Sequence, residues 1–244
     1  GCVGVPNVSS TGTSAQARAT LEACAQAHGL AAWQRIKDIS VSYDGEWYDI
    51  VQRVQPVLVD AGFRKSSQER LLLNAPVMAQ QHTGPSGSKF VLREGQNTQV
   101  WRNASPDRDA EVVGSAALVA DAYRMFLTGP FGFLDQLNLA EHGGTTSLDD
   151  RPQTLVLVPR KPGFGWGQND SCALYVDQQT KRLTRVRFTI DALASTRGAV
   201  VEVDFAGHRE LHGVQWPTQF FERIRKPIPM LPAHKWWMTG LDIN

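Results

Sequence analysis

Residues 172–191 read Cys172-Ala-Leu-Tyr-Val-Asp-Gln-Gln-Thr-Lys-Arg-Leu-Thr-Arg-Val-Arg-Phe-Thr-Ile-Asp191, and the rest of the predicted fold is organised around them. Val186, Phe188 and Ile190 alternate with polar side chains, which is the two-residue period of a half-buried strand. Residues 199–207 repeat this alternation, and the polar breaks after each run have the composition of hairpin loops. The pattern predicts consecutive antiparallel strands with one buried and one solvated face.

The composition of the 244 residues excludes two classes of protein. The chain is 42% hydrophobic and 20% charged and has no run of 18 apolar residues, so a membrane-spanning helix is not expected. The net charge is +1 and the basic residues are spread along the chain, which is unlike the clustered charge of a nucleic-acid-binding protein.

Further strands are predicted on both sides of a central apolar segment. Residues 39–47 alternate apolar and polar side chains, and short turn signals separate the runs that follow. The other predicted strands are 57–65, 69–73, 78–83, 89–94, 98–102, 154–159 and 213–223.

Two helices interrupt this pattern. An alanine-rich helix is predicted over 14–29, with Ser14 as its cap and Gly29 as its stop. A second helix, over 115–127, is apolar nearly all round and leads into an aromatic loop that ends at residue 134, so it is expected to be buried. A single curved sheet that receives residues 115–134 in its concave face gives this order of elements one common core.

The N-terminal residues differ from the rest of the chain. Gly1-Cys2 precedes a small, polar run, and the pair resembles the cleavage site of bacterial lipoproteins, in which the cysteine carries the lipid. Residues 1–14 are therefore expected to be a flexible tether after the lipidation site Cys2, and residues 15–244 a single domain. In an oxidising periplasm Cys24 and Cys172 could form a disulfide, or both could be buried free thiols.

The order of elements resembles the LolA and LolB family of periplasmic lipoprotein carriers. The residues that carry the resemblance are the alanine-rich first helix, the strand entry from Trp33 to Trp47, the central helix and loop, and the hairpin of residues 174–188 before Gly213-Val-Gln-Trp-Pro217. The resemblance implies an α+β, mainly β fold: an open, strongly curved antiparallel half-barrel covered by helices, whose hollow binds acyl chains.

Aromatic and apolar side chains are the candidate ligand-binding residues. They are expected either to fill the core or to line a hydrophobic cavity and its lid. These residues are Tyr43, Trp47, Phe63, Trp101, Leu118, Tyr123, Phe126, Phe131, Phe133, Phe188 and Phe205. The segment from Arg223 to Trp237, with its basic residues and two tryptophans, could touch lipid headgroups or simply cover the core.

Catalytic and metal-binding motifs are not expected to carry the function. His208 and His212 are four residues apart, but they fall in a predicted turn, and the glycine-rich loops lack phosphate-binding spacing. No cofactor is expected.

The sequence therefore predicts a non-enzymatic envelope lipoprotein, anchored to the outer membrane in the periplasm through Cys2, that binds and shuttles a lipid or an acylated protein. The alternatives are an enzyme acting on a lipid or glycolipid in the same cavity, and a scaffold that docks an envelope protein partner.

Overall fold

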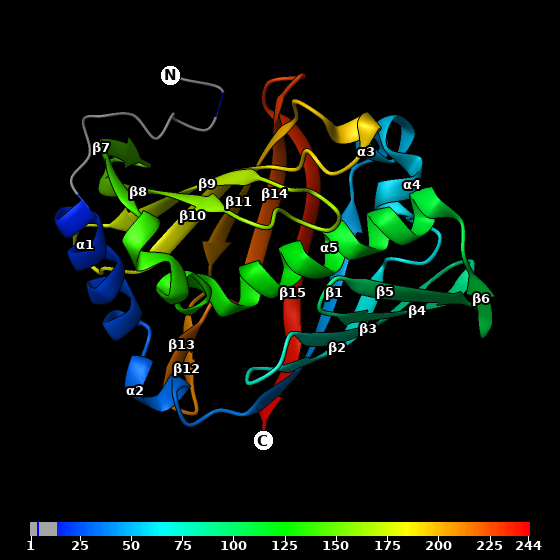
Figure 1. The fold of residues 1–244 in the computed structure, drawn as a ribbon, viewed down its shortest axis with the longest axis horizontal. Coiled ribbons are helices and arrows are strands. Elements are labelled where there is room, and N and C mark those ends of the chain that lie inside the picture. The colour runs from blue at the N-terminus through cyan, green and yellow to red at the C-terminus, as the bar shows by residue number, and fades with distance from the viewer. Residues whose placement is uncertain (1–3, 5–13) are drawn as a thin grey trace.

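The computed structural model describes residue 4 and residues 14–244 (Figure 1). Its helical elements are α1 (Ser14–Ala27), α2 (Leu30–Trp33), α3 (Asp49–Val54), α4 (Pro56–Val59), α5 (Ala110–Thr128) and the 3-10 segments η1 (Gly129–Leu139) and η2 (Ala194–Thr196). Its strands are β1 (Asp38–Trp47), β2 (Ser66–Leu72), β3 (Val77–Gly84), β4 (Gly87–Glu94), β5 (Asn97–Arg102), β6 (Ser105–Asp107), β7 (Glu141–Leu148), β8 (Arg151–Arg160), β9 (Asp170–Asp177), β10 (Leu183–Thr189), β11 (Val200–Ala206), β12 (Arg209–Leu211), β13 (Val214–Trp216), β14 (Gln219–Lys226) and β15 (Leu231–Ile243).

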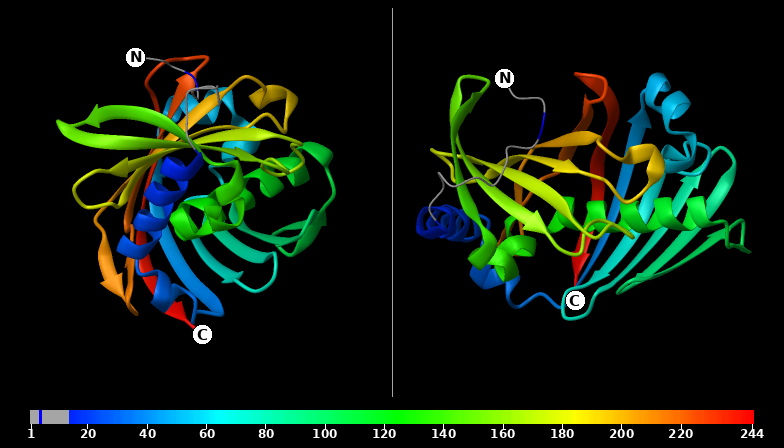
Figure 2. Two further views of the ribbon diagram at one scale, coloured as in Figure 1. Left: turned by 60° about the vertical axis from the view of Figure 1, so that its left-hand side comes forward. Right: turned by 45° about the horizontal axis from the view of Figure 1, so that its top comes forward.

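Thirteen of these strands form one antiparallel sheet. Their order is β6-β5-β4-β3-β2-β1-β15-β14-β11-β10-β9-β8-β7, so β6 and β7 are free edges and the sheet does not close into a barrel. The sheet curves around α5 (Figure 2). The predicted fold, an open and curved half-barrel covered by helices, is confirmed.

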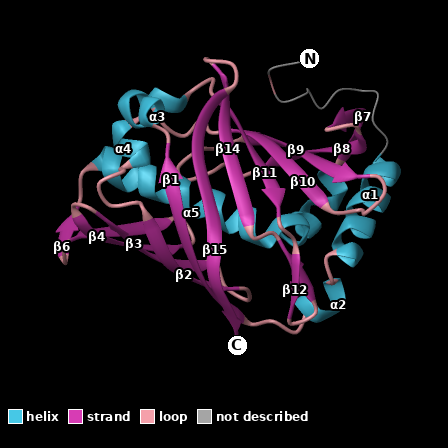
Figure 3. Cartoon of the chain, turned by 180° about the vertical axis from the view of Figure 1, so that it is seen from behind, coloured by secondary structure: helices cyan, strands magenta, loops and turns pink. Residues whose placement is uncertain are grey.

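The first and last strands of the sheet meet at its centre. Ile39 of β1 lies opposite Ile243 of β15, and the pairing continues to Trp47 opposite His234. Seen from behind, β14, β15 and β1 lie side by side across the back of the molecule (Figure 3). The first and last strands of the described chain, β1 and β15, therefore pair at the centre of the sheet.

Helix α5 lies in the concave face and is buried along most of its length. It begins at Ala110, five residues before the predicted start, because the Asp109 carboxylate caps it by accepting hydrogen bonds from the backbone N–H groups of Glu111 (3.0 Å) and Val112 (3.1 Å). The helix ends at Gly129, whose φ of 52° lies in the left-handed region.

Polar bonds fix one side of α5 to the sheet. Asp121 forms an ion pair with Arg93 of β4 (3.0 Å) and accepts a hydrogen bond from the Gly165 N–H group (2.7 Å). Arg124 donates to the carbonyl oxygens of Leu72 (2.6 Å) and Val77 (3.1 Å). Since both side chains reach strands β2 to β4, this side of the helix cannot move without breaking buried bonds.

The N-terminal helices cover the other end of the hollow. Helix α1 contacts η1 and strands β7 and β8, and Trp33 of α2 stacks on Phe131 of η1 with 4.4 Å between ring centroids. This end of the molecule is a filled core rather than an open space.

Two predicted strands are wrong. Residues 57–65 form helix α4 and a turn, because Pro56 starts a helical turn and Asp60 ends it in a left-handed conformation (φ 51°). Residues 213–223 hold two strands rather than one: β13 pairs with β12 in a separate hairpin, and β14 pairs with β11 and β15 in the large sheet. Strand β7 was not predicted, since its glycines and threonines show no alternation.

Candidate functional site

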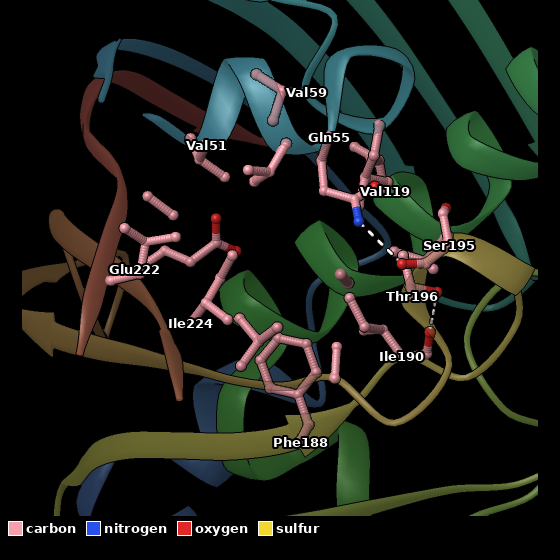
Figure 4. A pocket seen from close by; sticks show the side chains of 18 of the residues that line it. Val51, Gln55, Val59, Val119, Phe188, Ile190, Ser195, Thr196, Glu222 and Ile224 are labelled. Atoms are coloured by element: carbon pink, nitrogen blue, oxygen red, sulfur yellow. Dashed lines mark hydrogen bonds between the residues drawn. The ribbon is translucent and has the colours of Figure 1, made fainter. Parts of the chain in front are cut away.

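An apolar cavity of about 230 Å³ lies between α5 and the concave face of the sheet (Figure 4). Its walls come from α5, from strands β10, β11, β14 and β15, from α3 and α4, and from the loop around η2. A single water needs only roughly 10 to 15 Å³ on the same scale, so the space is large enough for part of an organic ligand.

The spacing of side chains on each element explains which of them face the cavity. Leu118, Val119, Ala122, Tyr123 and Phe126 recur at the three- to four-residue interval that places them on one face of α5. On β10 and just after it, Phe188 and Ile190 are two residues apart and therefore point the same way. The result is a wall that is mostly hydrocarbon.

Five of the eleven predicted ligand-binding residues line this cavity. They are Trp47, Leu118, Tyr123, Phe126 and Phe188.

Four others belong to the filled core. Tyr43 and Phe205 each pack edge to face on Phe220, with 5.8 and 5.9 Å between ring centroids. Phe131 stacks on Trp33, and Phe133 is buried in the same cluster. These side chains support the sheet and η1 but do not border the cavity.

The remaining two predicted residues lie at the far half of the sheet. Phe63 lies beneath the guanidinium of Arg102, 5.0 Å from it, and Trp101 packs on Phe90 with 5.5 Å between ring centroids. Val91 and Val100 are the side chains of β4 and β5 that pack beneath α5, so their neighbours Phe90 and Trp101 point to the outer face. An aromatic side chain by itself does not reveal which face of its strand is concave.

Sequence reasoning missed the segments that border the mouth of the cavity. Val54 is 47% exposed and Ile228 is 43% exposed, yet both line the cavity, as do Gln55 and Ser195. Gln55 Nε2 donates to the Ser195 carbonyl oxygen (2.9 Å), which joins the helical segment after β1 to the loop around η2 (Figure 4). The exposed apolar side chains at 54 and 228 mark this mouth in space, but residues from such distant parts of the chain share no sequence motif.

A chain of polar groups forms one side of the cavity. Arg64 donates through Nη1 to the Leu58 carbonyl oxygen (2.9 Å) and through Nη2 to the Tyr123 hydroxyl (3.2 Å). The Tyr123 hydroxyl in turn lies 2.9 Å from His234 Nδ1, and His234 stacks on Trp47 with 3.7 Å between ring centroids. Burial, aided by the nearby Arg64 charge, holds the pKa of His234 well below its usual range, so its ring is neutral.

Glu222 of β14 is the acidic group in the cavity wall. Its carboxyl group points into the space (Figure 4). Burial raises the pKa of Glu222 to about 7, although the positive charge of Arg64 acts in the opposite direction. At neutral pH this carboxyl group therefore exists both with and without its proton.

Cys24 and Cys172 do not form a disulfide; both are buried free thiols. Burial raises the pKa of Cys172 to about 12, and it raises that of Cys24 further, so neither thiol is reactive.

Cys2, the predicted lipidation site, and most of the predicted tether lie outside the described residues. Within residues 14–244, no three His, Cys, Asp or Glu side chains are grouped as metal ligands, and no helix is long and apolar enough to cross a membrane.

Comparison with known proteins identifies the fold. A LolA superfamily protein from Nitrosomonas europaea superposes with a TM-score of 0.55 at 12% sequence identity, covering 93% of each chain. An outer-membrane lipoprotein-sorting protein domain from Vibrio parahaemolyticus has a TM-score of 0.52 at 9% identity, again over 93% of each chain. The chain has a LolA-like fold.

A DUF1329 family protein from Desulfovibrio piger is similar to the same extent, with a TM-score of 0.51, 9% identity and 93% of each chain covered. No family model and no curated protein sequence matches the chain. The predicted resemblance to the LolA and LolB family is thus confirmed in three dimensions, at sequence identities that establish the fold alone.

Proposed function

We propose that this protein is a bacterial cell-envelope lipoprotein that binds the acyl chain of a lipid or of an acylated protein in the cavity beneath α5 and carries it. The cavity is the observation that supports the proposal, because its mostly hydrocarbon wall surrounds about 230 Å³ inside a LolA-like sheet. Burial of an acyl chain contributes roughly 0.8 kcal/mol per CH₂ group, so several methylene groups suffice for useful affinity without any chemical step.

The lipid anchor completes the proposed role. A lipidated Cys2 would hold the protein at the outer membrane, with the domain in the periplasm. The ligand would be shielded from water and handed to a membrane or an envelope protein partner unchanged, in the manner of a lipid-transport chaperone rather than an enzyme.

The route of entry follows from the bonds that hold α5. Because Asp121 and Arg124 fix this helix to β2, β3 and β4, opening by movement of α5 would break several buried polar bonds. Among the residues that the structure describes, one hydrogen bond bridges the mouth at Val54, Ser195 and Ile228, and it runs from Gln55 to Ser195. We therefore expect the ligand to enter through this mouth, and the loops to part there.

Native mass spectrometry of protein purified from its own host without detergent tests the proposal. A co-purified lipid or acylated peptide is the expected result. Conversion of an added lipid would instead support an enzyme in the same cavity. A protein with no bound lipid and no turnover would contradict both and favour a scaffold.

A cavity-filling variant tests where the ligand lies. Ala122 lines the cavity from α5, so Ala122→Phe places a ring in the open space without adding charge. Lipid uptake is expected to fall at least tenfold, measured by displacement of a fluorescent fatty-acid probe. Ala19→Phe, on the exposed face of α1, is the matched control and should bind as the wild type does. Equal uptake by both variants would place the ligand elsewhere.

A further inference from the structure

Glu222 occupies an inward-facing position of the sheet, where apolar side chains are usual. Phe220, Glu222 and Ile224 alternate along β14, so all three face inward; Phe220 is buried in the core and Ile224 lines the cavity. The neighbour of Glu222 across the sheet on β11 is Val203, which is fully buried. Its neighbour on β15 is His234, so the carboxyl group lies where the apolar wall meets the polar side of the cavity formed by Arg64, Tyr123 and His234.

This carboxyl group has no protein partner. Among residues 14–244 no side chain or backbone group forms a hydrogen bond or ion pair with Glu222, although the positive charge of Arg64 acts on it across the cavity. Arg64 lines the same cavity, but its guanidinium is engaged by Leu58, Val59 and Tyr123. The carboxyl group is only partly buried and opens onto the cavity, so its hydrogen-bond partner has to come from the contents of the cavity, and a bound ligand can supply it.

The charges around the cavity restrict the chemistry of that partner. Arg64 and Arg197 line the cavity with positive charge that opposes a cation, and the carboxylate of Glu222 opposes an anion beside it. A neutral hydrogen-bond donor satisfies both conditions. The simplest such donor on an apolar chain is a hydroxyl group, which donates its proton to a carboxylate and still presents an oxygen to its surroundings.

We propose that Glu222 is a specificity-determining residue that selects hydroxyl-bearing apolar ligands by accepting a hydrogen bond from the hydroxyl group inside the cavity. This inference rests on the proposed function, because it requires that the cavity hold an apolar chain. It adds that plain hydrocarbon chains bind more weakly than hydroxylated ones.

The test compares four compounds on four proteins. The compounds are n-dodecane, 1-dodecanol, 6-dodecanol and dodecylamine, each measured by displacement of a fluorescent apolar probe; the two alcohols present the hydroxyl group at the end and in the middle of the chain. The proteins are the wild type, Glu222→Leu, Glu222→Gln and the control Glu69→Gln, which alters a buried carboxyl group that does not line the cavity. Ratios of affinities are compared between proteins, so the different solubilities of the compounds cancel.

The wild type is expected to prefer the tighter-binding alcohol over n-dodecane by about ten- to a hundredfold more than Glu222→Leu does, which is the range for a hydrogen bond to a charged acceptor. Glu222→Gln should retain a smaller preference, and Glu69→Gln the full one.

Two results would overturn the inference while leaving the carrier function intact. Equal ratios in the wild type and Glu222→Leu would show that Glu222 is satisfied by water alone. A preference for dodecylamine over both alcohols would show that the site takes a cation. If none of the compounds binds any of the proteins, the proposed function fails and the inference fails with it.

Discussion

Both halves of the concave face consist of antiparallel strands, but the inward side chains are polar in one half and apolar in the other. On β2 to β4 the inward positions carry buried polar groups, among them Glu69, His82, Lys89 and Arg93. On β8 to β11 the inward positions are apolar, as the buried run of Val156, Leu174, Val186, Phe188 and Val203 shows. One sheet thus presents a polar half and an apolar half to the same central helix.

The polar half is closed by ion pairs, whereas the apolar half is left partly open. Lys89 pairs with Asp60 (2.7 Å) and Arg93 with Asp121 (3.0 Å), and these side chains occupy the space beneath α5. A small space of about 20 Å³ lies near Arg64, Ser67 and His82. Directional bonds therefore fix the position of α5 on one side, and an open apolar space remains on the other side.

The largest effect is expected from breaking an ion pair in the polar half. Arg93→Leu leaves Asp121 as a buried charge without its partner, and the loss should lower the free energy of unfolding by about 3 to 5 kcal/mol in urea denaturation. The double variant Arg93→Leu with Asp121→Leu removes both charges and should recover part of that loss. If the double variant is no more stable than Arg93→Leu alone, the pair does not act as a unit.

A pH dependence of stability is expected from Glu69 in the same half. Burial raises the pKa of Glu69 to about 7, opposed by a hydrogen bond from Ser67 (2.7 Å) and by the charge of Arg64. The folded protein then holds a proton that the unfolded chain releases from about pH 4.5 upward, so this group lowers stability as the pH rises to about 7.

Glu69→Gln removes this titration. Relative to the wild type, the variant should gain roughly 2 to 3 kcal/mol of stability between pH 5 and pH 8, measured by urea denaturation at both values. A gain that is the same at both pH values would show that Glu69 is ionised in the folded protein at pH 5.

The smallest effect is expected in the apolar half, where the hydrogen bond from Gln55 to Ser195 bridges the mouth. Gln55→Ala removes the bond to the Ser195 carbonyl oxygen and should speed ligand exchange by about two- to tenfold, with little change in global stability. Stopped-flow displacement of a fluorescent lipid measures the rate. An unchanged rate would mean that the ligand does not enter between these two segments.

The sequence predicted the strands of both halves better than it predicted which of their side chains face the concave side. Alternation at Val186 and Phe188 correctly predicted β10, and the apolar character of residues 115–127 correctly predicted a buried helix. The same alternation could not say that Trp101 faces outward, because a strand has two faces and only its neighbours decide which one is concave.

The cavity could be predicted only in part, for a related reason. Five of its lining residues were among those proposed from aromatic and apolar content, but Glu222, Gln55 and Ser195 come from three distant segments with no common motif. A strand over residues 57–65 was wrong because the three apolar residues after Pro56 fit a helical turn equally well. The local sequence pattern predicts a helix or a strand, but the residues of a cavity are known only once these elements have packed together.

The pairing of β1 with β15 has a consequence for biogenesis. Residues about two hundred positions apart, such as Ile39 and Ile243, meet at the seam that joins the two halves. Such contacts of high contact order form late. The concave face cannot acquire its final shape until β15 has been synthesised, because β15 lies between β1 and β14 in the sheet.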